Sequence, residues 1–266
     1  MNEVLHRTEL GCGKWEGRVR LPASDSKLPQ NEEWFELQDG GAWTRVRFHD
    51  YAQIYQQIGL YEHLFYGLLS CDSPRRVVGL LDEVLAEVTG EPAPLRVLDL
   101  GAGNGIVAEA LHERGGAQIV GLDILPEARA AALRDRPDAY ADYLVADLCD
   151  ASPDVIARLR AFDANALVCV AALGFGDIPA AAFHQAASLV STGGMLAFNI
   201  KEEFLDERYT HGFSELIRRM VREKVVRVEA MRRYRHRLSA AGTPLFYTAL
   251  VVTKLDEIPR SMLVDP

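Results

Sequence analysis

Apolar residues recur along this chain with two different spacings, one typical of strands and one typical of helices. From residue 95 onward, short apolar runs alternate with amphipathic stretches in which apolar residues are spaced three or four apart. This alternation predicts parallel strands joined by crossover helices, and therefore a doubly wound α/β sheet. The predicted strands are 95–100, 118–123, 143–148, 166–170 and 195–200.

The last part of the chain has a different pattern. Residues 214–224 place their apolar side chains on one helical face. Residues 225–238 and 246–255 follow as two long runs with strand character, separated by a turn sequence at 240–244. These runs predict one further helix and then two strands joined by a turn.

The first 94 residues predict an addition to this sheet. Residues 14–21 alternate between polar and apolar side chains, and 34–48 enclose Asp39-Gly40-Gly41, which predicts a strand and a hairpin. Helical spacing follows over 51–69, and Ser73-Pro74 begins another helix that ends near Gly90. We therefore expect an N-terminal extension over 1–48, a helical lid or lead-in region over 49–94, and a core domain over 95–266.

Composition is compatible with one principal core. The chain has 266 residues, of which 48% are hydrophobic and 25% charged, so it can fold without a disulfide or a metal. Its four cysteines lack the spacing of a metal or redox motif, and no metal site is expected. Because neither a leader pattern nor an apolar run of membrane-spanning length occurs, we expect a cytoplasmic protein without a membrane partner.

A glycine-rich turn joins the run 95–100 to the next helix. The sequence Asp99-Leu100-Gly101-Ala102-Gly103-Asn104-Gly105 fits a strand, a tight turn and a helix start, although glycines can also serve a tight connection alone. The dinucleotide fingerprint needs a third glycine where this chain has Ile106. The acid at 99 would oppose a phosphate and suits an ammonium group better. S-adenosylmethionine has an ammonium group and no phosphate.

Two further acids close the next two predicted strands. Asp123 follows the glycine turn by about 20 residues, where a carboxylate can bind the two hydroxyls of a ribose. Its alternative role as a helix cap is disfavoured, because Pro126 fits the first helical position and puts the N-cap at Leu125. Asp147 ends the third run, and all three acids are expected at the carboxyl edge of one sheet.

On these residues, the chain from about Leu95 to its C-terminus resembles the class I S-adenosylmethionine-dependent methyltransferases, in their small-molecule branch. The resemblance implies a Rossmann-like, mostly parallel seven-stranded sheet with the last strand antiparallel, and S-adenosylhomocysteine as the product. It also implies the cofactor-binding residues: Asp99 and the backbone of Gly101, Ala102 and Gly103 at the methionine part, Asp123 at the ribose, Ile124 against the adenine ring, Asp147 and Leu148 at the adenine, and Tyr55 on a leading helix that closes over the cofactor.

The segments after the fourth and fifth predicted strands bear on the acceptor. Residues 171–177 lack the Asn/Asp-Pro-Pro-Tyr/Phe and Cys-Pro motifs of nucleobase and glutamine methylation, so a small-molecule acceptor is favoured, methylated by in-line displacement. No catalytic residue is assigned from the sequence, and His211 is the candidate general base. The other candidate acceptor-side residues are Asn199, Glu202, Glu203, Tyr209, His49, Tyr51, Tyr55 and His63.

The charge distribution is uneven. The formal net charge is -9, yet residues 218–237 hold nine basic residues against two acids. This basic segment is either a solvated sheet edge or a reader of anions, as in an RNA or protein methyltransferase. The sequence also leaves open a NAD-dependent oxidoreductase and a non-catalytic cofactor-binding protein. No nucleic-acid partner is expected, and the protein is expected to be a monomer or a homodimer.

Overall fold

The computed structural model describes residues 12–23, 28–89, 94–173, 177–205 and 212–263. The chain divides into a small unit, residues 1–72 and 235–245, and a large unit, residues 73–234 and 246–266. This division differs from the predicted boundaries at 48 and 94. Helix α3 (Ser73–Thr89) belongs to the large unit because its apolar side chains pack against the central strands there.

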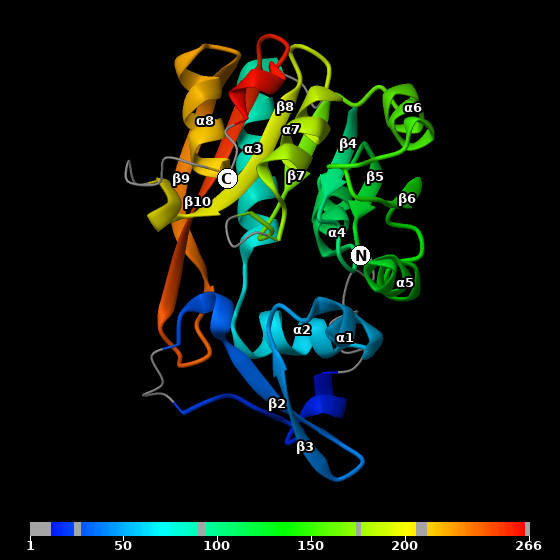
Figure 1. Cartoon of the computed structure of the whole chain (residues 1–266), viewed down its shortest axis with the longest axis vertical. Helices are drawn as coiled ribbons and strands as arrows, with labels where there is room; N and C mark the ends of the chain where they lie inside the picture. Colours follow the sequence, from blue (N-terminus) through cyan, green and yellow to red (C-terminus); the bar gives the residue numbers. More distant parts are fainter. Residues whose placement is uncertain (1–11, 24–27, 90–93, 174–176, 206–211, 264–266) are drawn as a thin grey trace, which may run out of the picture. The chain divides into compact units, whose positions relative to one another are not determined.

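The large unit is built on a seven-stranded sheet with the order β6-β5-β4-β7-β8-β10-β9 (Figure 1). Neighbouring strands from β6 to β8 are parallel, and β10 runs antiparallel to β8. The predicted doubly wound, mostly parallel sheet with an antiparallel last strand is therefore confirmed. The strands are β4 (Leu95–Leu100), β5 (Ala117–Asp123), β6 (Asp142–Val145), β7 (Ala166–Cys169), β8 (Met195–Lys201), β9 (Val226–Leu238) and β10 (Pro244–Lys254).

Helices cover both faces of this sheet because successive strand residues point to opposite sides. Val97 of β4 lies in the apolar cluster that includes α3 and α4, whereas Leu98 lies in the cluster that includes α7 and α8. Both side chains are fully buried, as expected for a central parallel strand that is covered by helices on both faces. The remaining helices are α4 (Ile106–Glu113), α5 (Pro126–Asp135), α6 (Pro153–Ala161), α7 (Ala180–Ser188) and α8 (Gly212–Arg222).

At β4, the chain changes the side of the sheet on which it adds further strands. The chain builds β5 and β6 on one side of this strand, then returns to build β7 and β8 on the other (Figure 1). In open α/β sheets, ligands bind outside the carboxyl ends of the strands at such a reversal. The glycine turn follows β4 directly and so lies at this point.

The small unit contains a three-stranded antiparallel sheet, β1-β2-β3, with short helices. The predicted hairpin is confirmed, but the predicted strand over 14–21 is mostly wrong, because a turn at Gly17 with φ of 74° leaves only β1 extended. The predicted helix over 51–69 is interrupted at Gly59, where φ is 74°. The elements are η1 (Cys12–Trp15), β1 (Val19–Arg20), η2 (Gln30–Glu32), β2 (Trp34–Asp39), β3 (Ala42–Arg47), α1 (Tyr51–Gln56), α2 (Leu60–Glu62) and the π-helix η3 (His63–Leu68).

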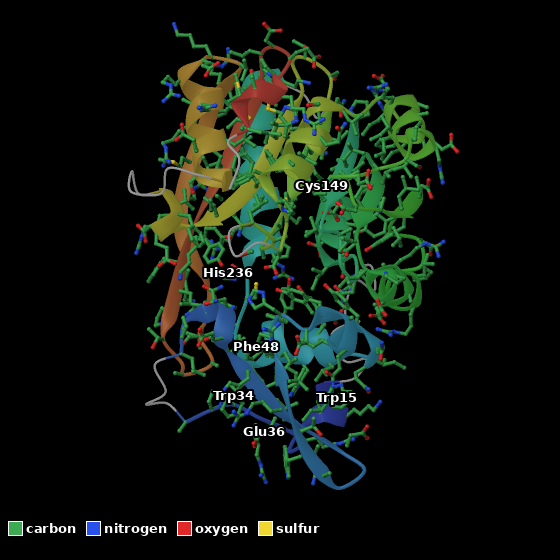
Figure 2. The ribbon with its side chains drawn as sticks, viewed as in Figure 1. Trp15, Trp34, Glu36, Phe48, Cys149 and His236 are labelled. Carbon is green, nitrogen blue, oxygen red and sulfur yellow. The ribbon has the colours of Figure 1, made fainter. Side chains whose placement is uncertain are left out.

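Buried aromatic side chains form the core of the small unit, with Trp15, Phe35 and Phe48 in one apolar cluster. Trp15 and Phe48 are labelled in Figure 2. A buried ion pair joins residues 235–245 to this unit: the Arg237 guanidinium donates to the Glu33 carboxylate at 2.7 Å. Two short helices complete the large unit, η4 (Glu202–Leu205) and η5 (Arg260–Met262). Within the described ranges, no helix is long and apolar enough to cross a membrane.

Candidate functional site

The loop after β4 owes its shape to three glycines. Gly101, Gly103 and Gly105 have φ of 73°, 54° and 87°, a region that side chains with a Cβ rarely adopt. Space is also restricted, since a Cβ on Gly101 would lie 2.9 Å from the Ile178 side chain. The buried Ala102 between them donates its N–H to the Leu122 carbonyl at 3.0 Å. The predicted turn is therefore demanded by both conformation and packing.

Asp99, at the end of β4, is a buried carboxylate with one oxygen unused. Its side chain is fully buried, and its Oδ2 accepts a hydrogen bond from the Tyr140 hydroxyl at 2.8 Å. Among the described residues, its Oδ1 has no hydrogen-bond partner. Burial raises the pKa of Asp99 to about 7, with the Tyr140 hydrogen bond acting against this rise and the nearby Asp123 carboxylate adding to it. A buried acceptor without a partner suits a cationic donor such as an ammonium group.

Asp123, at the end of β5, is oriented by the backbone. Its two carboxylate oxygens accept from the Gly103 N–H at 3.0 Å and the Leu125 N–H at 2.9 Å. Burial raises the pKa of Asp123, while these backbone bonds lower it. Helix α5 begins at Pro126 with Leu125 as its N-cap, as the sequence predicted, so Asp123 is not the cap. A carboxylate has about four lone-pair sites, so this one can still accept from two hydroxyl groups.

Two exposed apolar side chains stand beside Asp123. Ile124 is 58% exposed, and Val145, whose Cα is the register partner of Asp123 on β6, is 40% exposed. Covering large aliphatic side chains with a planar apolar group removes apolar surface from water and therefore favours binding. The ends of β5 and β6 thus offer an apolar surface next to a carboxylate.

Asp147 is exposed, and its Oδ1 accepts the Cys149 N–H at 2.8 Å. Strand β6 ends at Val145, two residues earlier than the prediction that a strand ends at this acid. Leu148 is buried in the apolar cluster of the sheet. Asp147 therefore lies in the loop beyond β6, and its side chain also forms a hydrogen bond with the Cys149 thiol.

Sequence reasoning missed two tyrosines at this site. The Tyr143 hydroxyl donates to the Gly103 carbonyl at 2.8 Å, and the Tyr140 hydroxyl is 3.3 Å from the Ala102 carbonyl. Their rings pack on Gly121, where a Cβ would lie 2.8 Å from the Tyr143 ring. A glycine inside a strand run is the signal that could have indicated such a close approach.

The structure encloses Asn199 among protein groups. This fully buried side chain accepts the Ala171 N–H at 2.6 Å and donates to the Tyr234 hydroxyl at 2.6 Å. Its bond holds Ala171 at φ of 59°, an unusual conformation for a residue with a Cβ. Asn199 thus shapes the loop after β7.

The other acceptor-side candidates of the large unit are less informative. Glu202 pairs with Arg233 at 2.8 Å, and Glu203 pairs with Lys201. Tyr209 and His211 lie outside the described residues. Within the part of the chain that the structure describes, no group of three His, Cys, Asp or Glu side chains could hold a metal ion.

The candidates in the small unit lie in and around an aromatic cluster. Tyr55 is buried, and its ring is 5.0 Å from that of Tyr61 and 6.2 Å from that of Tyr51. His49 contacts Tyr51, and burial lowers the pKa of His63. These contacts give Tyr55 a packing role, while its contact with a cofactor stays a prediction.

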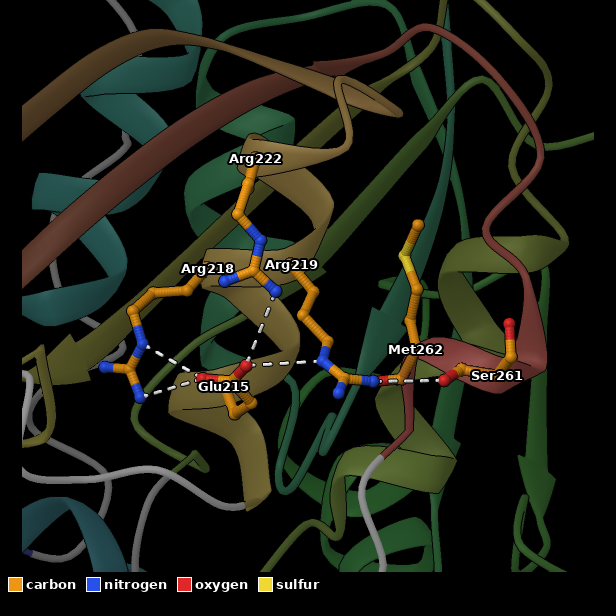
Figure 3. A network of polar contacts seen from close by, with 6 residues as sticks. All are labelled: Glu215, Arg218, Arg219, Arg222, Ser261 and Met262. Carbon is orange, nitrogen blue, oxygen red and sulfur yellow. Dashed lines mark hydrogen bonds and ion pairs between the residues drawn. The ribbon is translucent and has the colours of Figure 1, made fainter.

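Most basic residues of the segment over 218–237 form ion pairs with acids of this chain. Glu215 on α8 contacts Arg218, Arg219 and Arg222 (Figure 3). Seven of the nine basic residues pair with a carboxylate, the other four pairs being Arg227–Glu229, Arg232–Glu83, Arg233–Glu202 and Arg237–Glu33. Such internal pairing favours a charged sheet edge over a surface that reads anions.

Comparisons with known proteins agree with this geometry. Residues 98–198 match the family model described as a methyltransferase domain. The chain is 32% identical over 130 residues to the ubiquinone biosynthesis O-methyltransferase of Xanthomonas axonopodis pv. citri (strain 306), covering 47% of this chain and 52% of that protein. The protein of the same name from Neisseria meningitidis serogroup C (strain 053442) is 36% identical over 110 residues, with 39% and 43% covered. The chain thus spans about half the length of the curated relatives it matches.

Among solved structures, the chain is similar to the magnesium protoporphyrin IX methyltransferase of Synechocystis PCC 6803 with bound SAM. The TM-score is 0.47 at 16% identity, with 68% of this chain and 79% of that chain covered. The glycine loop, Asp123 and Asp147 all lie within residues 98–198, which match the methyltransferase-domain model. The resemblance to class I methyltransferases seen in the sequence is confirmed.

Proposed function

We propose that this chain, which carries a methyltransferase domain, transfers a methyl group from S-adenosylmethionine to a small-molecule acceptor. One observation carries the proposal: Asp99, Asp123 and Asp147 follow or end three neighbouring parallel strands, beside a loop whose glycines have positive φ. Ligands of open α/β sheets bind at this edge.

The residues at this edge fit the parts of the cofactor. The unused Oδ1 of Asp99 matches the ammonium group of the methionine part. Asp123 retains acceptor capacity for the ribose hydroxyls, and the exposed Ile124 can cover one face of the adenine ring. Asp147 accepts from Cys149, and because a carboxylate has about four lone-pair sites it can still accept from the adenine amino group. The buried Leu148 supports that loop from the apolar cluster.

When bound, the cofactor supplies a methyl group on a sulfonium, which an acceptor atom displaces in line. The protein then contributes mainly proximity and alignment, together with a base where the acceptor must lose a proton. His211 remains the candidate for that base. The relatives are named as O-methyltransferases, which supports an oxygen acceptor.

Three competing functions have less support. An RNA or protein methyltransferase would use the basic segment over 218–237, whose charges are mostly paired internally. A dinucleotide enzyme is disfavoured by Asp99, which would oppose a pyrophosphate, and by Ile106 in place of a third glycine. A non-catalytic cofactor-binding protein would bind the cofactor and transfer no label in the experiment below. A cytoplasmic location and a monomer or homodimer stay predictions.

A transfer experiment tests the proposal. The protein is incubated with S-adenosylmethionine labelled on its methyl group and with a cell extract separated into small-molecule, RNA and protein fractions. We expect label in the small-molecule fraction, and much less label when the Asp123→Ala variant replaces the parent at a cofactor concentration that just saturates the parent. Label confined to RNA or protein would favour a macromolecular methyltransferase instead.

A further inference from the structure

We infer that Tyr140 and Tyr143 are positioning residues of the cofactor site, whose hydroxyl groups hold the glycine loop in the shape that binds the cofactor. The inference rests on the proposed function, because it concerns the same loop. Neither tyrosine needs to touch the cofactor; Tyr143 acts through the loop backbone, and Tyr140 acts through Asp99 as well as the loop backbone.

The two hydroxyls hold two successive peptide planes. Tyr140 lies 3.3 Å from the Ala102 carbonyl, and Tyr143 donates to the Gly103 carbonyl at 2.8 Å. In a planar trans peptide, the C=O and the N–H of the next residue point in opposite directions. In the peptide between Ala102 and Gly103, the carbonyl faces Tyr140 and the N–H of Gly103 therefore points away from it. This N–H donates to Asp123 at 3.0 Å. A change at the tyrosines is thereby transmitted to the carboxylate expected to bind the ribose.

A loop of this composition needs such support. Glycine has more backbone freedom than other residues, so a loop with three glycines loses more conformational entropy when a ligand orders it. Groups that hold the loop before the ligand arrives reduce this cost and raise the affinity. The tyrosines are suited to the task because their rings are themselves fixed: Tyr143 is buried against Gly121, and the two rings meet edge to face at 5.1 Å.

Tyr140 has a second contact, with Asp99. Its hydroxyl donates to the Asp99 carboxylate at 2.8 Å, a shorter contact than that to the loop carbonyl. A hydroxyl has one hydrogen to donate, so while Asp99 is ionised the carboxylate is the better acceptor. Tyr140 thus favours the ionised form of Asp99, whereas the hydroxyl of Tyr143 contacts the loop carbonyl alone among the described residues.

The two tyrosines are therefore separable by experiment. Removing the Tyr143 hydroxyl loosens the loop without removing a hydrogen bond from Asp99. Removing the Tyr140 hydroxyl also raises the pKa of Asp99, because that hydrogen bond lowers it. The other titratable groups that interact with Asp99 are Asp123 from β5, Tyr143 from β6 and Cys169 from β7, and they are unchanged in the Tyr140 variant.

The test is calorimetric titration with S-adenosylhomocysteine of the parent, Tyr143→Phe, Tyr140→Phe and a control, Tyr234→Phe. The control loses the hydroxyl of another buried tyrosine, which contacts Ser73 and Asn199. We expect Tyr143→Phe to raise the Kd about 3- to 10-fold, as for one lost hydrogen bond. The control should stay within about twofold of the parent, while urea denaturation shows a similar loss of stability in both variants.

Tyr140→Phe adds a readout that a purely structural role would not move. Its affinity for S-adenosylhomocysteine is followed as the pH is lowered from 8.5 to 6. The affinity should begin to weaken at a higher pH than in the parent, because the pKa of Asp99 is higher in the variant and its carboxylate becomes protonated at a higher pH. This measurement also serves if Tyr143→Phe does not fold.

The outcomes distinguish the inference from the proposed function. A parent that binds no S-adenosylhomocysteine overturns both. A parent that binds, with Tyr143→Phe equal to the control or with an unchanged pH profile in Tyr140→Phe, overturns the inference alone.

Discussion

Replacing Asp99 with asparagine should remove a pH-dependent loss of stability. The pKa of this fully buried carboxyl is raised from the ordinary 3.8 to about 7, chiefly by burial. The folded state therefore binds the proton more tightly than the unfolded state, and stability falls as pH rises from about 4 to about 7. The rise in pKa corresponds to about 4 kcal/mol of unfolding free energy once the group is fully ionised.

The variant Asp99→Asn keeps an oxygen that can accept from Tyr140 but has no charge to desolvate. Between pH 5 and pH 8, the parent should lose about 2.5 kcal/mol more unfolding free energy than the variant, with the remainder of the 4 kcal/mol lost below pH 5. Urea denaturation of both proteins at the two pH values measures this difference. Groups such as His236 titrate in both proteins, so subtraction removes them.

An equal change in both proteins would refute the reasoning, because Asp99 would then have the same pKa folded and unfolded. Titration with S-adenosylhomocysteine gives the functional counterpart. At pH 8 the variant should bind more weakly than the parent even where it is the more stable protein, since asparagine offers no charge to the ammonium group. Stability and affinity should thus change in opposite directions at this residue.

Further outcomes are expected elsewhere. Asp123→Ala removes the acceptor for two backbone N–H groups and for the ribose hydroxyls. Calorimetry should therefore show S-adenosylhomocysteine binding that is about 2 to 4 kcal/mol weaker than in the parent. A variant that binds as tightly as the parent would disprove the role assigned to Asp123. Gly101→Ala puts a Cβ 2.9 Å from Ile178 at φ of 73°, so urea denaturation should show an unfolding free energy about 1 to 3 kcal/mol lower than in the parent. Gly79→Ala has open space around its Cβ inside α3 and should raise the unfolding free energy by about 0.5 to 1 kcal/mol. Equal effects of the two substitutions would contradict the packing argument. Burial holds the pKa of His236 well below its ordinary 6.5. The unfolded state therefore binds the proton more tightly, so the parent should lose stability as pH falls below about 6.5, and His236→Gln should lose less. Parallel profiles of the two proteins in denaturation experiments would show that the histidine is not buried in its neutral form.

Local patterns predicted the parts of the site that are continuous in sequence. The glycine turn after β4, the acid ending β5 and the helix beginning at Pro126 could all be inferred from a few adjacent residues. The hydroxyls of Tyr140 and Tyr143 could not, because they contact loop carbonyls 38 and 40 residues away. Only the folded sheet brings these groups together.

The same limit explains why the basic segment could not be interpreted from sequence. A run of like charges looks unbalanced in sequence, yet Arg232 pairs with Glu83, which is 149 residues away, and Arg233 pairs with Glu202. The predicted helix over 51–69 shows the opposite difficulty. Its apolar spacing is helical, but Gly59 adopts a left-handed conformation that interrupts the helix.

The central claim is that the carboxyl ends of β4, β5 and β6 bind an adenosyl cofactor without a phosphate. Calorimetric titration of the parent protein with S-adenosylmethionine, S-adenosylhomocysteine and NAD in parallel tests this claim most directly. Binding of the two adenosyl compounds with no heat from NAD is the expected result. Binding of NAD alone would contradict the claim and make the glycine loop a dinucleotide site.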